Sequence, residues 1–239
     1  TLAQLADLIV VNHALLFAEV ALDQPYLPLQ RCIIFDEAHN VENVATEAFA
    51  VTSESLDIYR VTNRLWRARR DGSGSGMVAT LMGIAEKELP ESGPLSRDTV
   101  LDLAQGVIES IGQATDAARS CYETLAEPFD PVPHYEDKIL LRDCRPPVGM
   151  EGPTGEAAEQ LAKTVRRLST RIEDLAECIS LNEEHLPSAG ELAGDLRAQN
   201  NRLEEAIENL EFVLAREEEN YVYWLERTRR RNRVFYSLH

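Results

Sequence analysis

The sequence is short of cations and cysteines, and each shortage excludes a class of protein. Lys and Arg number 24 against 41 Asp and Glu, so the 239-residue chain has a formal net charge of −17. A basic surface spread over the whole chain is therefore absent, and binding to a nucleic acid would need a local patch of cations. The four cysteines include no Cys-x-x-Cys pair, which argues against a zinc ribbon or a thioredoxin-like motif. Few, scattered cysteines are typical of a reducing cytosol, and we expect a cytoplasmic protein.

The sequence also lacks a membrane segment and a natural start. No apolar run reaches the roughly 18 residues that a membrane-spanning helix needs, so we expect no membrane partner. The chain begins at Thr1 without a methionine or a basic leader, and we expect it to be a piece of a longer protein. Hydrophobic residues make up 44% of the chain, enough for a sizeable core, and aromatic residues only 6%, which favours helices packed through aliphatic side chains.

The two ends of the chain have the texture of β-strands. Residues 8–11 and 32–35 are short, β-branched apolar runs, which are typical of strands covered on both faces in a parallel sheet. Residues 14–22 between them favour a helix, so the three pieces predict one βαβ unit. Residues 221–225 and 234–238 return to aromatic and β-branched composition. We expect the strands of both ends to meet in one small sheet.

The middle of the chain is helical in pattern. Apolar residues at helical spacing predict helices over 41–50, 56–70 and 77–89 and a long helix that Ser96 caps. Residues 72–76, Gly-Ser-Gly-Ser-Gly, predict a flexible loop. Six of the eleven prolines fall within 128–156, which predicts a long irregular crossing with a small strand at 138–141.

Two heptad patterns predict a long antiparallel helical hairpin. The first has apolar positions at Leu161, Val165, Leu168, Ile172, Leu175 and Ile179, and the second at Leu192, Leu196, Leu203, Ile207, Leu210 and Leu214. Residues 188–191 match a capping box at the start of the second helix. The expected fold class is therefore mainly α: a helical body with a long hairpin, inserted in a partial α/β domain.

A carboxylate pair after an apolar run is the motif that indicates chemistry. Asp36 and Glu37 follow residues 32–35, and His39 lies two residues further on. In nucleotide-hydrolysing enzymes an acid at this place helps to hold the magnesium ion that bridges the β- and γ-phosphates. A second acid orients and deprotonates the attacking water. An Asp-Glu pair alone is common at strand ends, but Asp-Glu-Ala-His after four apolar residues is more specific.

At this motif the sequence resembles the DEAH-box helicases of superfamily 2. Residues 6–17, ADLIVVNHALLF, look like a stretch that precedes the DEAH motif in DinG-type helicases, which are relatives of the XPD iron–sulfur helicases. Residues 40–45 after the motif and 223–226 near the chain end also resemble this group. Specific resemblance covers about residues 5–46 and 221–239, and the middle matches only in position and helical texture.

The resemblance implies an ATP-dependent DNA helicase that translocates on single-stranded DNA, of a DNA repair or replication type. Residues 1–45 would belong to the first motor domain, 46–220 to an inserted helical arch and 221–239 to strands returning to the motor domain. Asp36 would bind Mg²⁺ through water, Glu37 would activate water, and His39 would couple the motif to its neighbours. ATP and Mg²⁺ would be the parent protein's ligands, and the rest of the helicase polypeptide would be a partner. The arch of this family helps to enclose the translocating strand.

The departures from the family pattern bear on activity. No GxxxxGK[ST] phosphate loop occurs in the sequence, and the arginine-bearing motifs of a second motor domain are absent. The family's iron–sulfur cysteines lie upstream of the Asn12-His13 stretch, some close relatives lack the cluster, and no cysteine of this chain is assigned to one. We expect this chain by itself to be inactive and to bind single-stranded DNA no tighter than the non-specific range of about 10⁻⁴–10⁻⁶ M.

Three sets of residues are candidates for DNA contacts. Asn12 and His13 either contact DNA or a neighbouring motif, or else serve as a helix N-cap and a packed ring. Arg64 and Arg67 flank Trp66, a basic and aromatic combination that single-strand binding uses, although a core role for the tryptophan is the alternative. The third set, in an arginine cluster after residue 226, is Arg229 and Arg230, for which a solvated hairpin is the alternative.

Two other function classes compete with the helicase interpretation. In the first, the long helical hairpin is a protein-interaction module without catalysis and the DEAH sequence is coincidental. In the second, the chain holds a metal, which is disfavoured because no His, Cys and Asp residues have ligand spacing.

Overall fold

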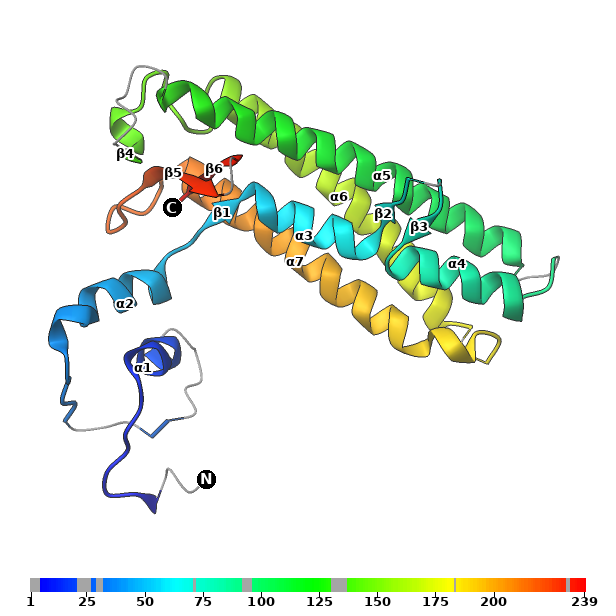
Figure 1. The fold of residues 1–239 in the computed structure, drawn as a ribbon, viewed down its shortest axis with the longest axis horizontal. Coiled ribbons are helices and arrows are strands. Elements are labelled where there is room, and N and C mark those ends of the chain that lie inside the picture. Colours follow the sequence, from blue (N-terminus) through cyan, green and yellow to red (C-terminus); the bar gives the residue numbers. More distant parts are fainter. Residues whose placement is uncertain are drawn as a thin grey trace. The chain divides into compact units, whose positions relative to one another are not determined.

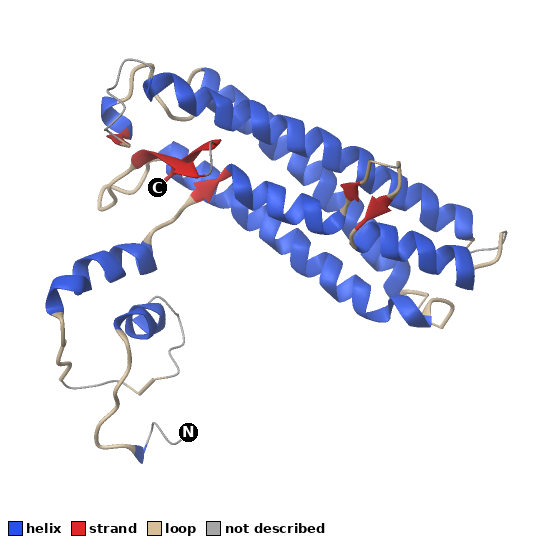
Figure 2. Cartoon of the chain, viewed as in Figure 1, coloured by secondary structure: helices blue, strands red, loops and turns tan. Residues whose placement is uncertain are grey.

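The chain divides into two compact units. The computed structural model describes residues 5–20, 27–28, 32–70, 72–91, 96–129, 137–182, 184–230 and 233–239, and of Arg230 and Arg233 it describes the backbone alone. The N-terminal unit is Thr1–Val51 and the helical unit is Thr52–His239 (Figure 1). The chain is mainly α-helical, as the sequence predicted (Figure 2). No helix in the described part of the chain is long and apolar enough to cross a membrane.

The helical unit is a bundle with four long sides. Helices α5 (Arg97–Glu123), α6 (Pro153–Ser180) and α7 (Gly190–Ala215) make three of them. Helices α3 (Ser55–Leu65) and α4 (Met77–Glu88) follow one another along the fourth (Figure 1). The predicted hairpin of α6 and α7 is present, but α5 packs against α6 at least as extensively, so the hairpin is half of a bundle.

The predicted heptad positions form the core of this bundle, except Leu192, which is only partly buried. Leu161, Leu168 and Leu175 are fully buried on α6, as are Leu196 and Leu203 on α7. Small side chains on α5, Ala104, Ala114 and Ala118 among them, are equally buried. Small residues let helix backbones approach closely, and the leucines of the neighbouring helices fill the space between them.

Helix ends follow the predicted signals at one position and not at another. The Ser96 hydroxyl accepts a hydrogen bond from the Thr99 amide at 3.2 Å, so the predicted cap of α5 is confirmed. The predicted capping box at residues 188–191 is wrong. There a 3₁₀ turn, Pro187–Ala189, leads into α7, whose first residue is Gly190, and no side chain caps the helix. Pro187 fixes the chain in this turn, so Ser188 lies inside it and not at the N-cap.

The predicted helix over 56–70 ends at Leu65, because Trp66 is extended. Short strands β2 (Arg67–Ala68) and β3 (Gly74–Ser75) then pair as an antiparallel hairpin, where the sequence predicted a flexible loop. A Cβ atom at Gly74 would collide with the Trp66 indole. The half-buried Trp66 side chain thus packs on the hairpin, and this packing is possible because residue 74 is a glycine.

A small antiparallel sheet closes one end of the helical unit. Its strand order is β1 (Ser53–Glu54), β6 (Arg233–Leu238), β5 (Trp224–Arg230) and β4 (Lys138–Leu140). The predicted strands at 138–141 and 234–238 are confirmed, whereas the strand predicted at 221–225 begins only at Trp224 and continues to Arg230. The expected union of these strands with residues 8–11 and 32–35 is wrong, since β5 and β6 pair with each other and with strands of their own unit. The assignment of residues 221–239 to a motor domain stays a prediction.

The N-terminal unit contains helices but no described strand. Helix α1 (His13–Val20) and helix α2 (Val41–Phe49) pack on each other, and a 3₁₀ turn, Ala38–Asn40, precedes α2. Residues 8–11 and 32–35 pair with no strand of the described chain, so the predicted βαβ unit is not formed here. A strand needs a hydrogen-bonded neighbour, and the described residues supply none to either segment.

Candidate functional site

Asp36, Glu37 and His39 lie together on an exposed turn of the N-terminal unit. The Glu37 amide donates a hydrogen bond to Asp36 Oδ1 at 2.9 Å. Glu37 has a left-handed backbone, with φ of 49° and ψ of 47°, a conformation that is uncommon for a residue with a side chain. This turn reverses the chain and brings His39 Nδ1 to 3.3 Å from Glu37 Oε2. The side chains of His39 and Glu37 are 72% and 68% exposed.

Stacked rings hold the segment before this turn against α1. Phe35 lies beside Phe17 with ring centroids 6.2 Å apart and nearly parallel planes. The His13 ring meets Phe35 edge-on at 5.7 Å, and Phe17 also meets Phe49 of α2 at 5.9 Å. Aromatic pairs at these distances stabilise beyond their buried area. The ADLIVVNHALLF segment and the DEAH segment are thereby brought together in space.

Asn12 caps α1. Its Oδ1 accepts a hydrogen bond from the Leu15 amide at 2.8 Å, which is the N-cap alternative drawn from the sequence. His13 makes the ring contact with Phe35, the packed alternative. Both residues therefore have structural roles beside the acidic turn, and their contact with DNA stays a prediction.

The acidic turn has the donor set for a hard cation. Asp36 Oδ1 is engaged by the Glu37 amide, whereas Oδ2 has no partner in the described part of the chain. Mg²⁺ prefers carboxylate oxygen and keeps several waters, so one available carboxylate oxygen fits water-mediated binding. Glu37 Oε2 faces the His39 imidazole, which contacts it directly at 3.3 Å. No group of three or more His, Cys, Asp and Glu arranged to hold a metal occurs among the residues the structure describes.

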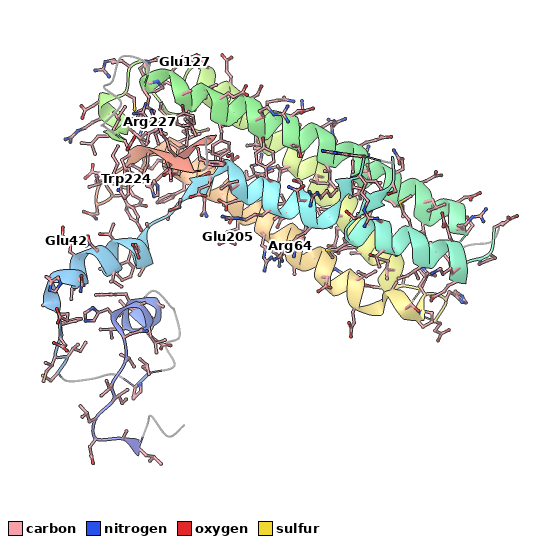
Figure 3. The ribbon with its side chains drawn as sticks, viewed as in Figure 1. Glu42, Arg64, Glu127, Glu205, Trp224 and Arg227 are labelled. Atoms are coloured by element: carbon pink, nitrogen blue, oxygen red, sulfur yellow. The ribbon has the colours of Figure 1, made fainter. Side chains whose placement is uncertain are left out.

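The predicted DNA-binding arginines fall on two parts of the helical unit. Arg64 lies on α3 and Arg67 on β2, both exposed. Arg229 and Arg230 lie on β5 near the tip of the β5–β6 hairpin, and the side chain of Arg230 lies outside the described atoms. Arg64 is in a groove between α3 and α7 (Figure 3), whereas Arg229 is on a strand, so the structure does not gather these arginines at one place.

Sequence reasoning missed the α7 side of this groove. Arg202, Glu205 and Gln199 lie on α7 and line the same hollow as Arg64. Arg202 and Arg197 are the two cations of an acidic helix and lie five residues apart, so a search for basic runs passed over Arg202. Its position one residue before the buried Leu203, at the margin of the core stripe, is the signal that could have found it.

A second polar cluster surrounds His239 at the sheet. Its ring stacks on Trp224 with centroids 4.7 Å apart. The imidazole nitrogens lie 3.2 Å from the Thr52 hydroxyl and 3.0 Å from the Ser237 hydroxyl. Burial lowers the pKa of His239, the Lys138 cation lowers it further and the Glu226 carboxylate opposes them. This ring belongs to the packing of the sheet and not to the acidic turn.

Comparison with known proteins gives one partial relative and no family. No family model matches the chain. Over 69 residues the chain is 39% identical to the ATP-dependent DNA helicase YoaA of Haemophilus influenzae, a match that covers 26% of this chain and 11% of that protein. The chain thus spans about a tenth of the length of the curated relative it matches. The similarity supports a relationship to a helicase.

Proposed function

We propose that this chain is part of an ATP-dependent DNA helicase of the DinG type, in which the N-terminal unit supplies the DEAH turn and the helical unit is the arch. The observation that carries the proposal is the acidic turn itself. Asp36, Glu37 and His39 follow an apolar segment in the family's order, and the rings of His13 and Phe17 hold that segment against the helix of the second matching motif. The partial likeness to a DNA helicase supports it.

In this function each member of the turn has its own task. Asp36 offers Oδ2 to a water of the magnesium shell, and a bound Mg²⁺ would neutralise charge on the phosphates of ATP. Glu37 orients the attacking water and accepts its proton. His39, 3.3 Å from Glu37, positions that carboxylate and connects it to neighbouring motifs. The left-handed backbone at Glu37 reverses the chain between this carboxylate and His39.

The intact parent protein gives the test. The Glu37→Gln variant should lower DNA-stimulated ATP hydrolysis by about 10²-fold or more, because an amide cannot take the proton of water, while nucleotide binding stays nearly unchanged. The matched control is Glu47→Gln on α2, an exposed glutamate of the same unit, which should hydrolyse ATP at the normal rate. An unaltered rate in Glu37→Gln would remove the helicase proposal and favour the non-catalytic interaction module.

The chain of 239 residues should not hydrolyse ATP, because its sequence has no phosphate loop to hold the nucleotide. An ATPase activity of this chain that disappears in Glu37→Gln would contradict that expectation. A cytoplasmic location and an iron–sulfur cluster upstream of Asn12 are parts of the same proposal that the parent protein would test.

A further inference from the structure

A groove between α3 and α7 of the helical unit is lined mostly by polar side chains. It has a volume of about 640 Å³. Arg60 and Arg64 line it from α3, and Gln199, Arg202 and Glu205 line it from α7. Arg64 and Glu205 mark its two walls in Figure 3, and α3 packs along α7.

The acids at the start of α3 already have partners. Glu54 and Asp57 form a reciprocal capping box at the N-terminus of α3. Asp57 also pairs with Arg60 at 3.0 Å. Asp57 and Arg60 therefore offset each other, and Glu54 keeps a negative charge that the helix N-terminus stabilises.

The remaining cations of the groove lack a carboxylate partner. Among the described residues, no Asp or Glu lies within ion-pair distance of Arg64 or Arg202. Arg202 Nη1 donates only a long hydrogen bond, 3.5 Å, to Gln199 Oε1. Gln199 is 6% exposed, so the arginine stands over a buried amide. Two guanidiniums on facing helices thus point to an anionic ligand.

The cations extend beyond the hollow. Arg67 and Arg69 are exposed and continue the series after α3 ends. A row of cations fits a chain of regularly spaced negative charges better than it fits a single anion. The amide of Asn209, which also lines the hollow, can in addition meet the edges of unpaired bases.

Glu205 is the exception within this groove. Its carboxylate is exposed and makes no ion pair among the residues the structure describes. A carboxylate beside a phosphate path repels the ligand and lowers its affinity. A nucleic-acid strand that moves through a protein must be bound weakly. A carboxylate such as that of Glu205 would keep the binding weak.

We propose that this groove holds the phosphodiester backbone of a single strand between Arg64 and Arg202, and that Glu205 limits its affinity. The inference rests on the proposed function, because it takes a moving nucleic-acid strand as the ligand. DNA and RNA share the phosphodiester that these arginines would contact.

The test is a binding titration of the 239-residue chain with a labelled oligothymidylate, at about 50 and 200 mM salt. Arg64→Ala and Arg202→Ala should each weaken binding by on the order of tenfold and reduce the salt slope by about 0.7. Glu205→Gln should tighten binding severalfold. Arg119→Ala is the matched control, because Arg119 pairs with Asp116 on α5 and does not line the groove, and its binding should be unchanged.

Other outcomes would overturn the inference. These are wild-type binding by both groove variants, no tightening by Glu205→Gln, or tighter binding of a phosphoserine peptide than of the oligonucleotide. Circular dichroism of each variant distinguishes a lost contact from a lost fold. An oligouridylate tests RNA as the source of the phosphodiester, with equal loss in Arg64→Ala expected. The binding titration does not depend on Glu37. A normal ATPase rate of the Glu37→Gln parent protein would therefore overturn the proposed function, and the groove would still be tested separately by the titration.

Discussion

The two units differ in what they do with their apolar side chains. In the helical unit, leucines, isoleucines and valines of five helices are buried to near completion. In the described part of the N-terminal unit no apolar side chain is buried, and its large exposed ones are Leu5, Leu8, Val10, Leu15, Val20, Ile33, Ile34, Phe35 and Phe49. Soluble domains rarely expose so many large apolar side chains close together unless a partner covers them. The helical unit therefore contains its own core, and the N-terminal unit needs neighbours.

The largest expected effect concerns independent folding. Residues 52–239 expressed alone should unfold cooperatively with nearly the midpoint of the whole chain, because their core lies within that unit. Residues 1–51 alone should show little helix and no cooperative transition. Circular dichroism during thermal unfolding measures both. A cooperative transition in the short piece would show that it has a core of its own.

Truncating a large apolar side chain should cost several kcal/mol more unfolding free energy in the helical unit than in the N-terminal unit. Leu168→Ala removes a side chain that is 0% exposed and should cost about 2–5 kcal/mol of unfolding free energy. Leu8→Ala, where the leucine is 80% exposed, should change it by no more than about 0.5 kcal/mol. Urea unfolding of the two variants measures the difference. Equal losses would mean that the N-terminal unit contributes to the main transition.

Removal of a helix cap should also destabilise the helical unit more than the N-terminal unit, but by a smaller free energy than removal of a buried leucine. Ser96→Ala removes the cap of α5 and should destabilise the bundle by about 1 kcal/mol. Asn12→Ala removes a similar bond at α1, but the bundle should keep its unfolding midpoint, because α1 belongs to the N-terminal unit. Urea unfolding curves of both variants measure this difference. A lower unfolding midpoint in Asn12→Ala would show that the two units unfold in one transition.

The smallest effect should appear on acidification. Burial, with help from Lys138, lowers the pKa of His239 below the 6.5 of an unfolded chain, while Glu226 opposes this. The unfolded state thus binds the proton more readily, so stability should be complete above about pH 6.5 and fall as the pH drops through the lowered pKa. His239→Gln should reduce this loss, and His39→Gln in the N-terminal unit should leave it unchanged. Thermal unfolding at pH values from about 7.5 down to about 5, on either side of 6.5, measures the loss of stability.

The helices were largely predictable because their information is local. A 3.6-residue apolar period predicts a buried face, and Ser96 marks a helix start wherever the rest of the chain lies. The apolar run before Asp36 predicted a strand for the same reason, and residues 32–35 form none in the described chain. Residues 8–11 were predicted as a strand on equally local grounds, but a strand also needs a neighbour, and no pattern within the segment supplies one. The capping box at 188–191 failed because Pro187 and the following turn decided where α7 begins.

By itself the sequence determined the mainly helical fold, the heptad core of α6 and α7 and the order of Asp36, Glu37 and His39. The tertiary structure alone decided that α5 joins those helices in a bundle, that β5 and β6 pair with strands of the helical unit, and that Arg64 and Arg202 line one groove. The physical reason is the range of the forces involved. Periodicity and capping act within a few residues, whereas strand pairing and the meeting of two helix faces depend on residues that are distant along the chain.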